Sequence, residues 1–347
     1  MGAANGGARL KVRATTGEKG HHVPRTCPPA DQRGSALVLV IILAAVLTGI
    51  VLFAQLRARL DLAATQRALT QLVLHQAAAE GIRTALARLA ADDEPGVDHL
   101  RKSWALPQLV TNPAGIVVRV RVIDENRFFD WNNLAIPPLG PQARSANDIA
   151  LDLLNLCGDY APVDRLAALG DWVDADSSGL WETPFYQQQA PPASAANRPL
   201  FAWGELLYIH GFSRDFFRPH EGETVFSRAV TNLPASFTVV PFPRDRPTRV
   251  NVNTASREVL LALAGVDQAS AIQQLLALRE AGPLRTLQPI RRAVAPRLQD
   301  AVERFLDVRS LFFRVEAVAL LGDQSARICA VARRDENSAM AIVQWVF

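Results

Sequence analysis

Residues 33–56 read RGSALVLVIILAAVLTGIVLFAQL, and this stretch decides how the rest of the chain is organised. No residue from 35 to 56 carries a charge, and residues 35–54 form a largely apolar run of twenty residues. Twenty helical residues at about 1.5 Å each span roughly 30 Å, the thickness of the hydrocarbon core of a bilayer. The sequence therefore predicts a transmembrane helix over residues 35–54.

The charges on either side of this stretch predict its orientation. Residues 1–34 contain six basic and two acidic side chains, a net charge of +4. Because cytoplasmic flanks are enriched in Lys and Arg, we expect a cytoplasmic N-terminus. A cleaved secretory signal fits less well, since its apolar region is about 7–15 residues long and ends at a small-x-small site. Leu52 is too large for that site. A plain signal anchor and a buried core helix stay open as alternatives.

The composition is that of a folded chain whose body has no excess of positive charge. Hydrophobic residues make up 49% and charged residues 20% of the 347 residues, which provides ample material for a core. The whole chain carries +3, so the part after residue 34 carries −1 and offers no support for nucleic-acid binding. Cys27, Cys157 and Cys329 have no metal-type spacing. Pairing of Cys157 with Cys329 and two separate buried thiols are both open.

A long helix is predicted to continue beyond the membrane, over residues 35–91. It ends at Asp92-Asp93-Glu94-Pro95, where acidic charge at a helix C-terminus is unfavourable and proline breaks the helix. Apolar residues recur at spacings typical of one helical face. These residues are Leu62, Leu69, Leu72, Ala79, Ile82, Leu86 and Leu89. A solvent-exposed coiled coil is the alternative.

The remaining residues predict an α+β body in which a helical block separates two groups of strands. Residues 115–123, GIVVRVRVI, alternate valine with arginine as a half-buried strand does. Near the C-terminus, strands are predicted at 313–320, 326–332 and 340–347. The intervening helices are predicted at 147–156, 163–173, 203–209, 257–263, 269–281 and 297–305. This order predicts a sheet split by a helical insert.

The junction before the span resembles the prepilin peptidase site of type IV pilins and type II pseudopilins. Arg33 and Gly34 stand directly ahead of the charge-free span. In that family the peptidase cuts after the glycine and methylates the new N-terminus, which implies a cut between Gly34 and Ser35. The fifth residue of such a mature chain is usually Glu. Here it is Leu39, and the K-type minor pseudopilin characteristically lacks that carboxylate.

Several strings in the body strengthen the resemblance to the K type. In order along the chain they are DEN at 124–126, NNL at 132–134, GDWVDAD at 170–176, ANRPL at 196–200, EL with GF at 205–212, and VNVNTA at 250–255. Together with the N-terminus they cover most of residues 33–265. Arg127 replaces the glycine that the K-type pattern has after DEN, so the turn there is expected to differ.

The resemblance implies a type IV pilin-like α+β fold and a place in a secretion machine. The implied regions are a cytoplasmic leader at 1–34, an N-terminal helix at 35–91, a pilin-like sheet at 92–140 and 309–347, and an inserted α-helical domain at 141–308. The implied protein is a minor pseudopilin of the type II secretion system that starts and caps the pseudopilus tip. Its implied partners are other minor pseudopilins, the major pseudopilin, the prepilin peptidase and the inner membrane, with the main domain in the periplasm. A tip-like minor pilin of a type IV pilus or DNA-uptake machine is the alternative.

The loop at 174–179, DADSSG, resembles the start of an EF-hand. Carboxylates stand at its first and third positions, an oxygen at the fifth and glycine at the sixth, with Glu182 at the ninth. Phe185 occupies the twelfth position, where a bidentate Glu normally completes the calcium shell. K-type pseudopilins bind calcium in their helical domain, which implies calcium here. The implied ligands are Asp174 and Asp176, with Asp171, Ser178 and Glu182 as further candidates; a solvated acidic turn is the alternative.

Residues 250–266 also look like a helix-hairpin-helix DNA-binding element. Phosphate binding at such a hairpin uses backbone amides and cations, whereas Asp267 brings a negative charge to the hairpin. A helix entry with Thr254 as N-cap explains the same residues without DNA. No enzyme is predicted, because the four histidines after Gly34 have no metal-type spacing and no nucleophile elbow or phosphate loop is present.

Overall fold

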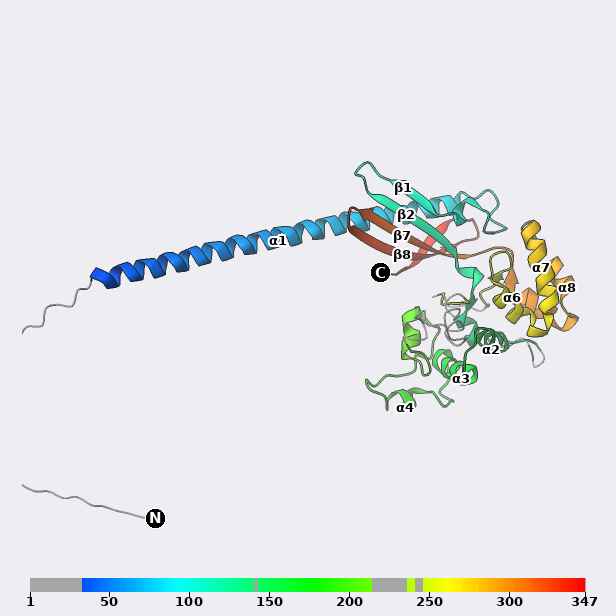
Figure 1. The fold of residues 1–347 in the computed structure, drawn as a ribbon. Helices are drawn as coiled ribbons and strands as arrows, with labels where there is room; N and C mark the ends of the chain where they lie inside the picture. Colours follow the sequence, from blue (N-terminus) through cyan, green and yellow to red (C-terminus); the bar gives the residue numbers. More distant parts are fainter. Residues whose placement is uncertain (1–32, 139, 141–142, 214–235, 241–245, 347) are drawn as a thin grey trace, which may run out of the picture. The chain divides into compact units, whose positions relative to one another are not determined.

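A computed structural model describes residues 33–138, 140, 143–213, 236–240 and 246–346. Residues 1–32 of the expected leader (1–34), which include Cys27, lie outside these residues. The first described element is α1, Arg33–Ala90, a single helix of 58 residues (Figure 1). This agrees with the predicted helix at 35–91. A boundary between two compact units of the chain falls inside α1, after Gln66.

The N-terminal part of α1 is lined with large apolar side chains. Its large apolar side chains from Leu37 to Phe53 are each more than half exposed. Within the described part of the chain, this is the one helix that is long and apolar enough to cross a membrane. Thr48 lies within this apolar run. Its Oγ1 donates a hydrogen bond to the carbonyl of Ala44 at 2.8 Å, so the hydroxyl is satisfied within the helix.

The rest of α1 packs on one face of a five-stranded antiparallel sheet. The strands are β1 Gln108–Thr111, β2 Val117–Asp124, β7 Phe312–Leu321, β8 Gln324–Arg334 and β9 Met340–Val346, in the order β1-β2-β7-β8-β9. The predicted strands are all present, and β1 was not predicted. β2 pairs with β7, almost two hundred residues later, so the chain leaves the sheet after β2 and returns to its neighbour (Figure 1).

The apolar face of α1 differs from the predicted one. Leu74, Ala78 and Ile82 are fully buried against the sheet, whereas Leu69 and Leu72 are exposed on another side of the helix. The predicted set combines seven-residue and three-residue steps, which at about 100° per residue shift by about −20° and −60° around the helix, so its members do not stay on one face. The predicted stripe was therefore wrong in its N-terminal half, while Ile82, Leu86 and Leu89 are buried as expected.

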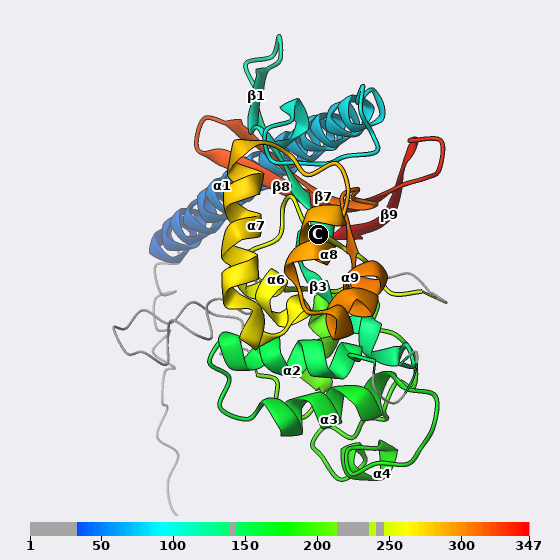
Figure 2. The same ribbon diagram turned by 90° about the vertical axis from the view of Figure 1, so that its right-hand side faces the viewer.

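The residues between β2 and β7 form a second core of mostly short helices. The α-helices are α2 Ala146–Leu156, α3 Pro162–Val173, α4 Thr183–Tyr186, α6 Arg257–Ala264, α7 Ala269–Ala281, α8 Gln288–Ala293 and α9 Gln299–Phe305. The predicted helix at 203–209 is a 3-10 helix, Trp203–Tyr208, and α4 and α8 were not predicted. The helices α2, α3 and α4 lie farther from the sheet than α6 to α9 (Figure 2). This arrangement is an α+β pilin-like fold, as predicted.

Two short parallel strand pairs tie distant parts of the insert together. β3 Phe129–Asp130 pairs with β4 Phe237–Thr238, and β5 Val250–Asn251 pairs with β6 Leu306–Asp307. The residues around β5 also correct the predicted helix cap. Ser256, not Thr254, caps α6, since its Oγ accepts the N–H of Val259 at 3.3 Å. Thr254 is buried and its hydroxyl donates instead to Asp124, at 2.5 Å.

A close helix–sheet contact at Gly81 gives a test of this packing. A Cβ at Gly81 would lie 2.8 and 2.9 Å from side-chain carbons of Val118 and Val120 on β2. We expect Gly81→Ala to lower the free energy of unfolding by about 1–3 kcal/mol through overpacking, although alanine favours helix. Thermal unfolding of the detergent-purified full chain measures the change.

Gly170 in α3 is the matched control for Gly81. It also lies inside a helix, but a Cβ there would meet nothing within 4 Å. Gly170→Ala should raise stability by about 0.5–1 kcal/mol, because alanine restricts the unfolded chain and favours helix. Equal gains from both substitutions would contradict the packing of α1 on β2.

Candidate functional site

The acidic loop begins where α3 ends and finishes where α4 begins. Asp174 follows the last residue of α3 with extended backbone angles, φ −74° and ψ 171°, so the chain turns out of the helix there. Glu182 occupies the N-cap position of α4. The two helix ends thus bring Asp174, Asp176 and Glu182 together, and each offers a carboxylate oxygen within 4.8 Å of the others.

Several oxygens in this loop are buried and have no hydrogen-bond partner. They are Oδ1 of Asp174 and both carboxylate oxygens of Glu182, a side chain that is only 4% exposed. Burial raises the pKa of Asp174, and the charges of Asp176 and Asp171 raise it further. The pKa of Glu182 is raised by burial first, and then by Asp171 and Asp174. Buried, mutually repelling acceptors without donors fit a hard cation such as calcium, which binds oxygen ligands.

The other predicted ligands have different surroundings. Asp171 accepts the N–H of Trp181 at 2.8 Å, and its carboxylate fills the space where Gly179 would carry a Cβ. Gly179 is therefore required by this close approach, and Asp171 fixes the shape of the loop. Ser178 is exposed, and its backbone N–H donates to Asp176 at 2.7 Å. Coordination by Asp171 and Ser178 stays a prediction.

Asn197 is a candidate ligand that the sequence analysis missed. Its side-chain Nδ2 donates to the carbonyl of Asp176 at 2.6 Å, and its backbone N–H donates to the carbonyl of Trp172 at 2.9 Å. Its Oδ1 is buried and has no partner. Asn197 also adopts φ 46°, a left-handed conformation that asparagine tolerates better than most residues. The ANRPL string at 196–200 gave no local signal for this role, since the contact joins residues 21 positions apart.

An aromatic cluster supports the same loop. Trp181 stacks on His210 with ring centroids 3.8 Å apart, and Phe185 packs edge-on against both rings. The hydroxyl of Tyr186 accepts the backbone N–H of His210 at 3.2 Å. The segment that carries His210 is therefore held beside α4, and these rings act as packing around the acidic loop.

The helix-hairpin-helix hypothesis does not gain support from the geometry. Gly265 ends α6 with φ 94°, and the carboxylate of Asp267 lies close to the space where Gly265 would carry a Cβ. Asp267 pairs with Arg297 at 2.6 Å. A carboxylate beside the hairpin amides and an engaged cation are unfavourable for a phosphate.

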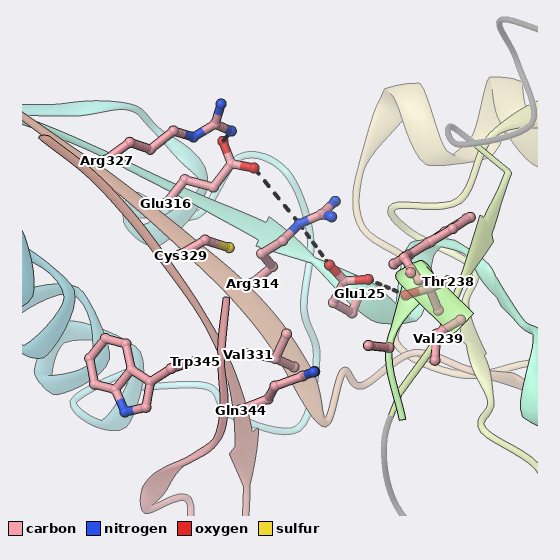
Figure 3. A pocket seen from close by; sticks show the side chains of 13 residues that line it. Glu125, Thr238, Val239, Arg314, Glu316, Arg327, Cys329, Val331, Gln344 and Trp345 are labelled. Carbon is pink, nitrogen blue, oxygen red and sulfur yellow. Dashed lines mark hydrogen bonds and ion pairs between the residues drawn. The ribbon is translucent and has the colours of Figure 1, made fainter. Parts of the chain in front are cut away.

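A cavity of about 660 Å³ lies between the sheet and the insert (Figure 3). Its charged side chains are paired with each other. Arg314 lies 2.9 Å from Glu125 and 3.9 Å from Glu316, and Arg327 lies 3.2 Å from Glu316. Burial raises the pKa of Cys329 to about 11, so its thiol stays protonated at neutral pH. Cys157 and Cys329 are both free and buried.

The predicted processing site lies at the start of α1. The helix begins at Arg33, so Gly34 and Ser35 belong to its first turn. Cleavage between Gly34 and Ser35 stays a prediction.

Comparison with known proteins finds relatives that cover most of the chain. No protein-family model matches the sequence. Type II secretion system protein K of Aeromonas hydrophila is 26% identical over 339 residues, which cover 90% of this chain and 96% of that protein. A putative type II secretion system protein K of Escherichia coli K12 is 29% identical over 197 residues, 54% of this chain. These relatives support a pseudopilin of the type II secretion system protein K type. The match spans 60% of the length of the E. coli relative.

A solved structure shares the fold of this chain. It is the GspK-GspI-GspJ complex of the type 2 secretion system from enterotoxigenic E. coli, in which one chain aligns with a TM-score of 0.65. The alignment covers 81% of this chain and 97% of that chain, at 20% sequence identity. A match of this extent includes both the pilin-like sheet and the helical insert.

The unpaired carboxylate oxygens of Asp174 and Glu182 predict that calcium raises the stability of the protein. We expect the full chain in detergent to melt at a higher temperature in excess calcium than in chelator. At 100 times a dissociation constant of about 10⁻⁴–10⁻³ M, binding to the folded state stabilises it by about 2.7 kcal/mol. Asp174→Asn with Glu182→Gln should abolish the difference.

The same double variant should be more stable than the wild-type chain in chelator. Both carboxyls have raised pKa values, so their ionised forms are unfavourable in the folded protein without a cation. Asp323→Asn, in the turn between β7 and β8, is the matched control and should keep the full calcium effect. If the melting temperature of the wild-type chain is the same in calcium and in chelator, the loop is a solvated acidic turn.

Proposed function

We propose that this chain is a minor pseudopilin that starts and caps the pseudopilus tip of a type II secretion system. The observation that carries the proposal is α1, a single helix whose first part is apolar and exposed and whose last part packs on a pilin-like sheet. Such a helix anchors a subunit in the membrane before assembly and packs against other subunits afterwards. The solved complex that shares this fold is named for three components, which supports two further minor pseudopilins as partners here.

The proposed location is the inner membrane, with the body in the periplasm. The basic residues before the span favour a cytoplasmic N-terminus. The prepilin peptidase would act at that side and cut between Gly34 and Ser35. The helix would then remain on the mature subunit, with a methylated Ser35 at its start. Leu39 in place of the usual Glu removes a charged contact with a neighbouring subunit, which counts against a place within the shaft of the fibre.

The insert explains why this subunit would sit at the tip. The helices between β2 and β7 add a second core beside the pilin-like sheet. That bulk obstructs stacking of another subunit above, whereas the major pseudopilin can still add below. The proposed role is therefore structural, with no reaction and no nucleic-acid partner. Calcium at Asp174, Asp176 and Glu182 would brace the loop between α3 and α4, since it neutralises charges that otherwise repel.

Assembly with partner subunits is the direct test. The full chain is coexpressed with the two other minor pseudopilins of the same secretion locus, and complexes are purified in detergent through a tag on this chain. We expect both partners to copurify. Leu69→Asp with Leu72→Asp should reduce their recovery, because these exposed leucines lie on the part of α1 that the sheet does not cover.

Leu278→Asp is the matched control for the helix variant. Leu278 is an exposed leucine of the insert, 51% accessible compared with 57% for Leu69, and its substitution should leave recovery unchanged. Absence of both partners from the wild-type preparation would refute the proposed assembly.

Processing is tested by the mass of the mature N-terminus. We expect coexpression with the prepilin peptidase to yield a chain that begins at methylated Ser35. Gly34→Val should leave uncut precursor, because a side chain at this position blocks the extended backbone from entering a protease cleft. A mature chain that begins near residue 54 would indicate a secretory signal instead.

A further inference from the structure

The face of the sheet opposite α1 carries apolar side chains near the β1–β2 hairpin. Alternation along the strands places Val118 and Val120 of β2 against α1, so Val117, Arg119 and Arg121 point the other way. The strand register adds Leu109 of β1 beside Arg119, and Val318 and Leu320 of β7 opposite Arg119 and Val117. We call this set the outer patch: Leu109, Val117, Arg119, Arg121, Val318 and Leu320. Solvated sheet faces are normally polar, so apolar residues here depart from the usual pattern.

The two arginines of the outer patch have no ion-pair partner among the described residues, whereas other arginines on the same face are paired. Arg314 contacts Glu125 and Arg327 contacts Glu316 (Figure 3). Arg121 lies opposite Glu316 in the register, but that carboxylate is engaged by Arg327 at 3.2 Å. In the part of the chain that the structure describes, neither Arg119 nor Arg121 forms a salt bridge, and both are exposed. The patch therefore presents unneutralised positive charge around an apolar centre.

We propose that the outer patch is a docking surface for an acidic segment of a neighbouring pilin-like subunit. Charge complementarity selects the partner, since two adjacent free arginines attract carboxylates and repel basic surfaces. Arginine also suits an interface because it forms bidentate bonds with carboxylates and remains charged when partly desolvated. Leu109, which is 65% exposed, would supply the apolar contact. This inference rests on the proposed function, which provides the neighbouring subunits.

The position of β1 favours a protein over a lipid surface as the occupant. β1 is an edge strand of the sheet, so one side of its backbone pairs with no other described strand. Exposed N–H and C=O groups are costly in hydrocarbon, whereas side chains or backbone of another polypeptide satisfy them. Pro107 and Pro113 flank this strand and limit how far a pairing chain can extend along it. The contact would therefore be short, with the two arginines giving most of its specificity.

The experiment measures assembly of the full chain with the other minor pseudopilins in nanodiscs of neutral phosphatidylcholine. Fluorophores on the chain and on each partner report the assembled fraction by energy transfer over a range of salt concentrations. We expect Arg119→Glu with Arg121→Glu to weaken assembly about tenfold or more, mainly through slower association, and to remove its salt dependence. Arg119→Gln with Arg121→Gln should give a smaller loss, because it removes attraction without adding repulsion.

A control double variant separates the patch from general charge effects. Arg257→Glu with Arg292→Glu makes the same change in net charge at exposed arginines of the insert and should leave assembly unchanged. Thermal unfolding of each variant confirms that the fold is retained.

The remaining outcomes overturn one proposal or the other. Failure of the wild-type chain to assemble refutes the proposed function. Wild-type assembly that the Arg119/Arg121 double variant retains refutes the docking surface alone. A loss that occurs only in membranes with anionic phosphatidylglycerol assigns the patch to lipid. Energy transfer between two copies of this chain that the double variant loses assigns it to self-association.

Discussion

The rest of the body depends on the hydrogen bonds that the buried carboxylate of Asp124 accepts. This carboxylate lies at the end of β2 and accepts hydrogen bonds from Asn126 N–H at 2.9 Å, Ser310 Oγ at 2.6 Å and Thr254 Oγ1 at 2.5 Å. Asn126 lies in the turn after β2, Thr254 lies in the insert, and Ser310 lies in the segment before β7. Burial raises the pKa of Asp124 to about 6, against the opposing effect of its hydrogen bonds. One side chain thus joins the point where the chain leaves the sheet to the point where it returns.

A second buried carboxylate extends this joint to α1 and β8. Asp98 follows the long helix, pairs with the fully buried Arg334 at 2.7 Å, and accepts the N–H of Ser310 at 2.8 Å. Asn251 donates to the carbonyl of Asp98 and to Ser310 Oγ. The sheet and the insert are therefore fixed to one another through polar groups that have few alternatives in a dry environment. This rigidity allows one subunit to present a helix, a sheet face and a bulky insert to different neighbours.

The sequence predicted those parts of the fold that local patterns determine. The alternation of valine and arginine in β2 and the uninterrupted run of α1 are visible without any partner. β1 is a four-residue strand, QLVT, whose pairing with β2 depends on the hairpin rather than on its own composition. Thr254 was predicted to cap a helix because it precedes one. Its actual partner lies 130 positions earlier, and no local rule connects the two.

The same limit applies to the candidate cation site, and it distinguishes two kinds of buried carboxylate. Asp124 and Glu182 are both buried acidic residues, and the sequence does not show which of them has hydrogen-bond donors around it. The structure surrounds Asp124 with donors, so it requires no ligand. It leaves both oxygens of Glu182 without a donor, in a cluster with the carboxylates of Asp174 and Asp176. Because an unsatisfied buried carboxylate costs several times more than a satisfied one, only the second arrangement calls for a cation. The acidic loop therefore stays a candidate cation site, whereas the hydrogen bonds at Asp124 are complete without any ligand.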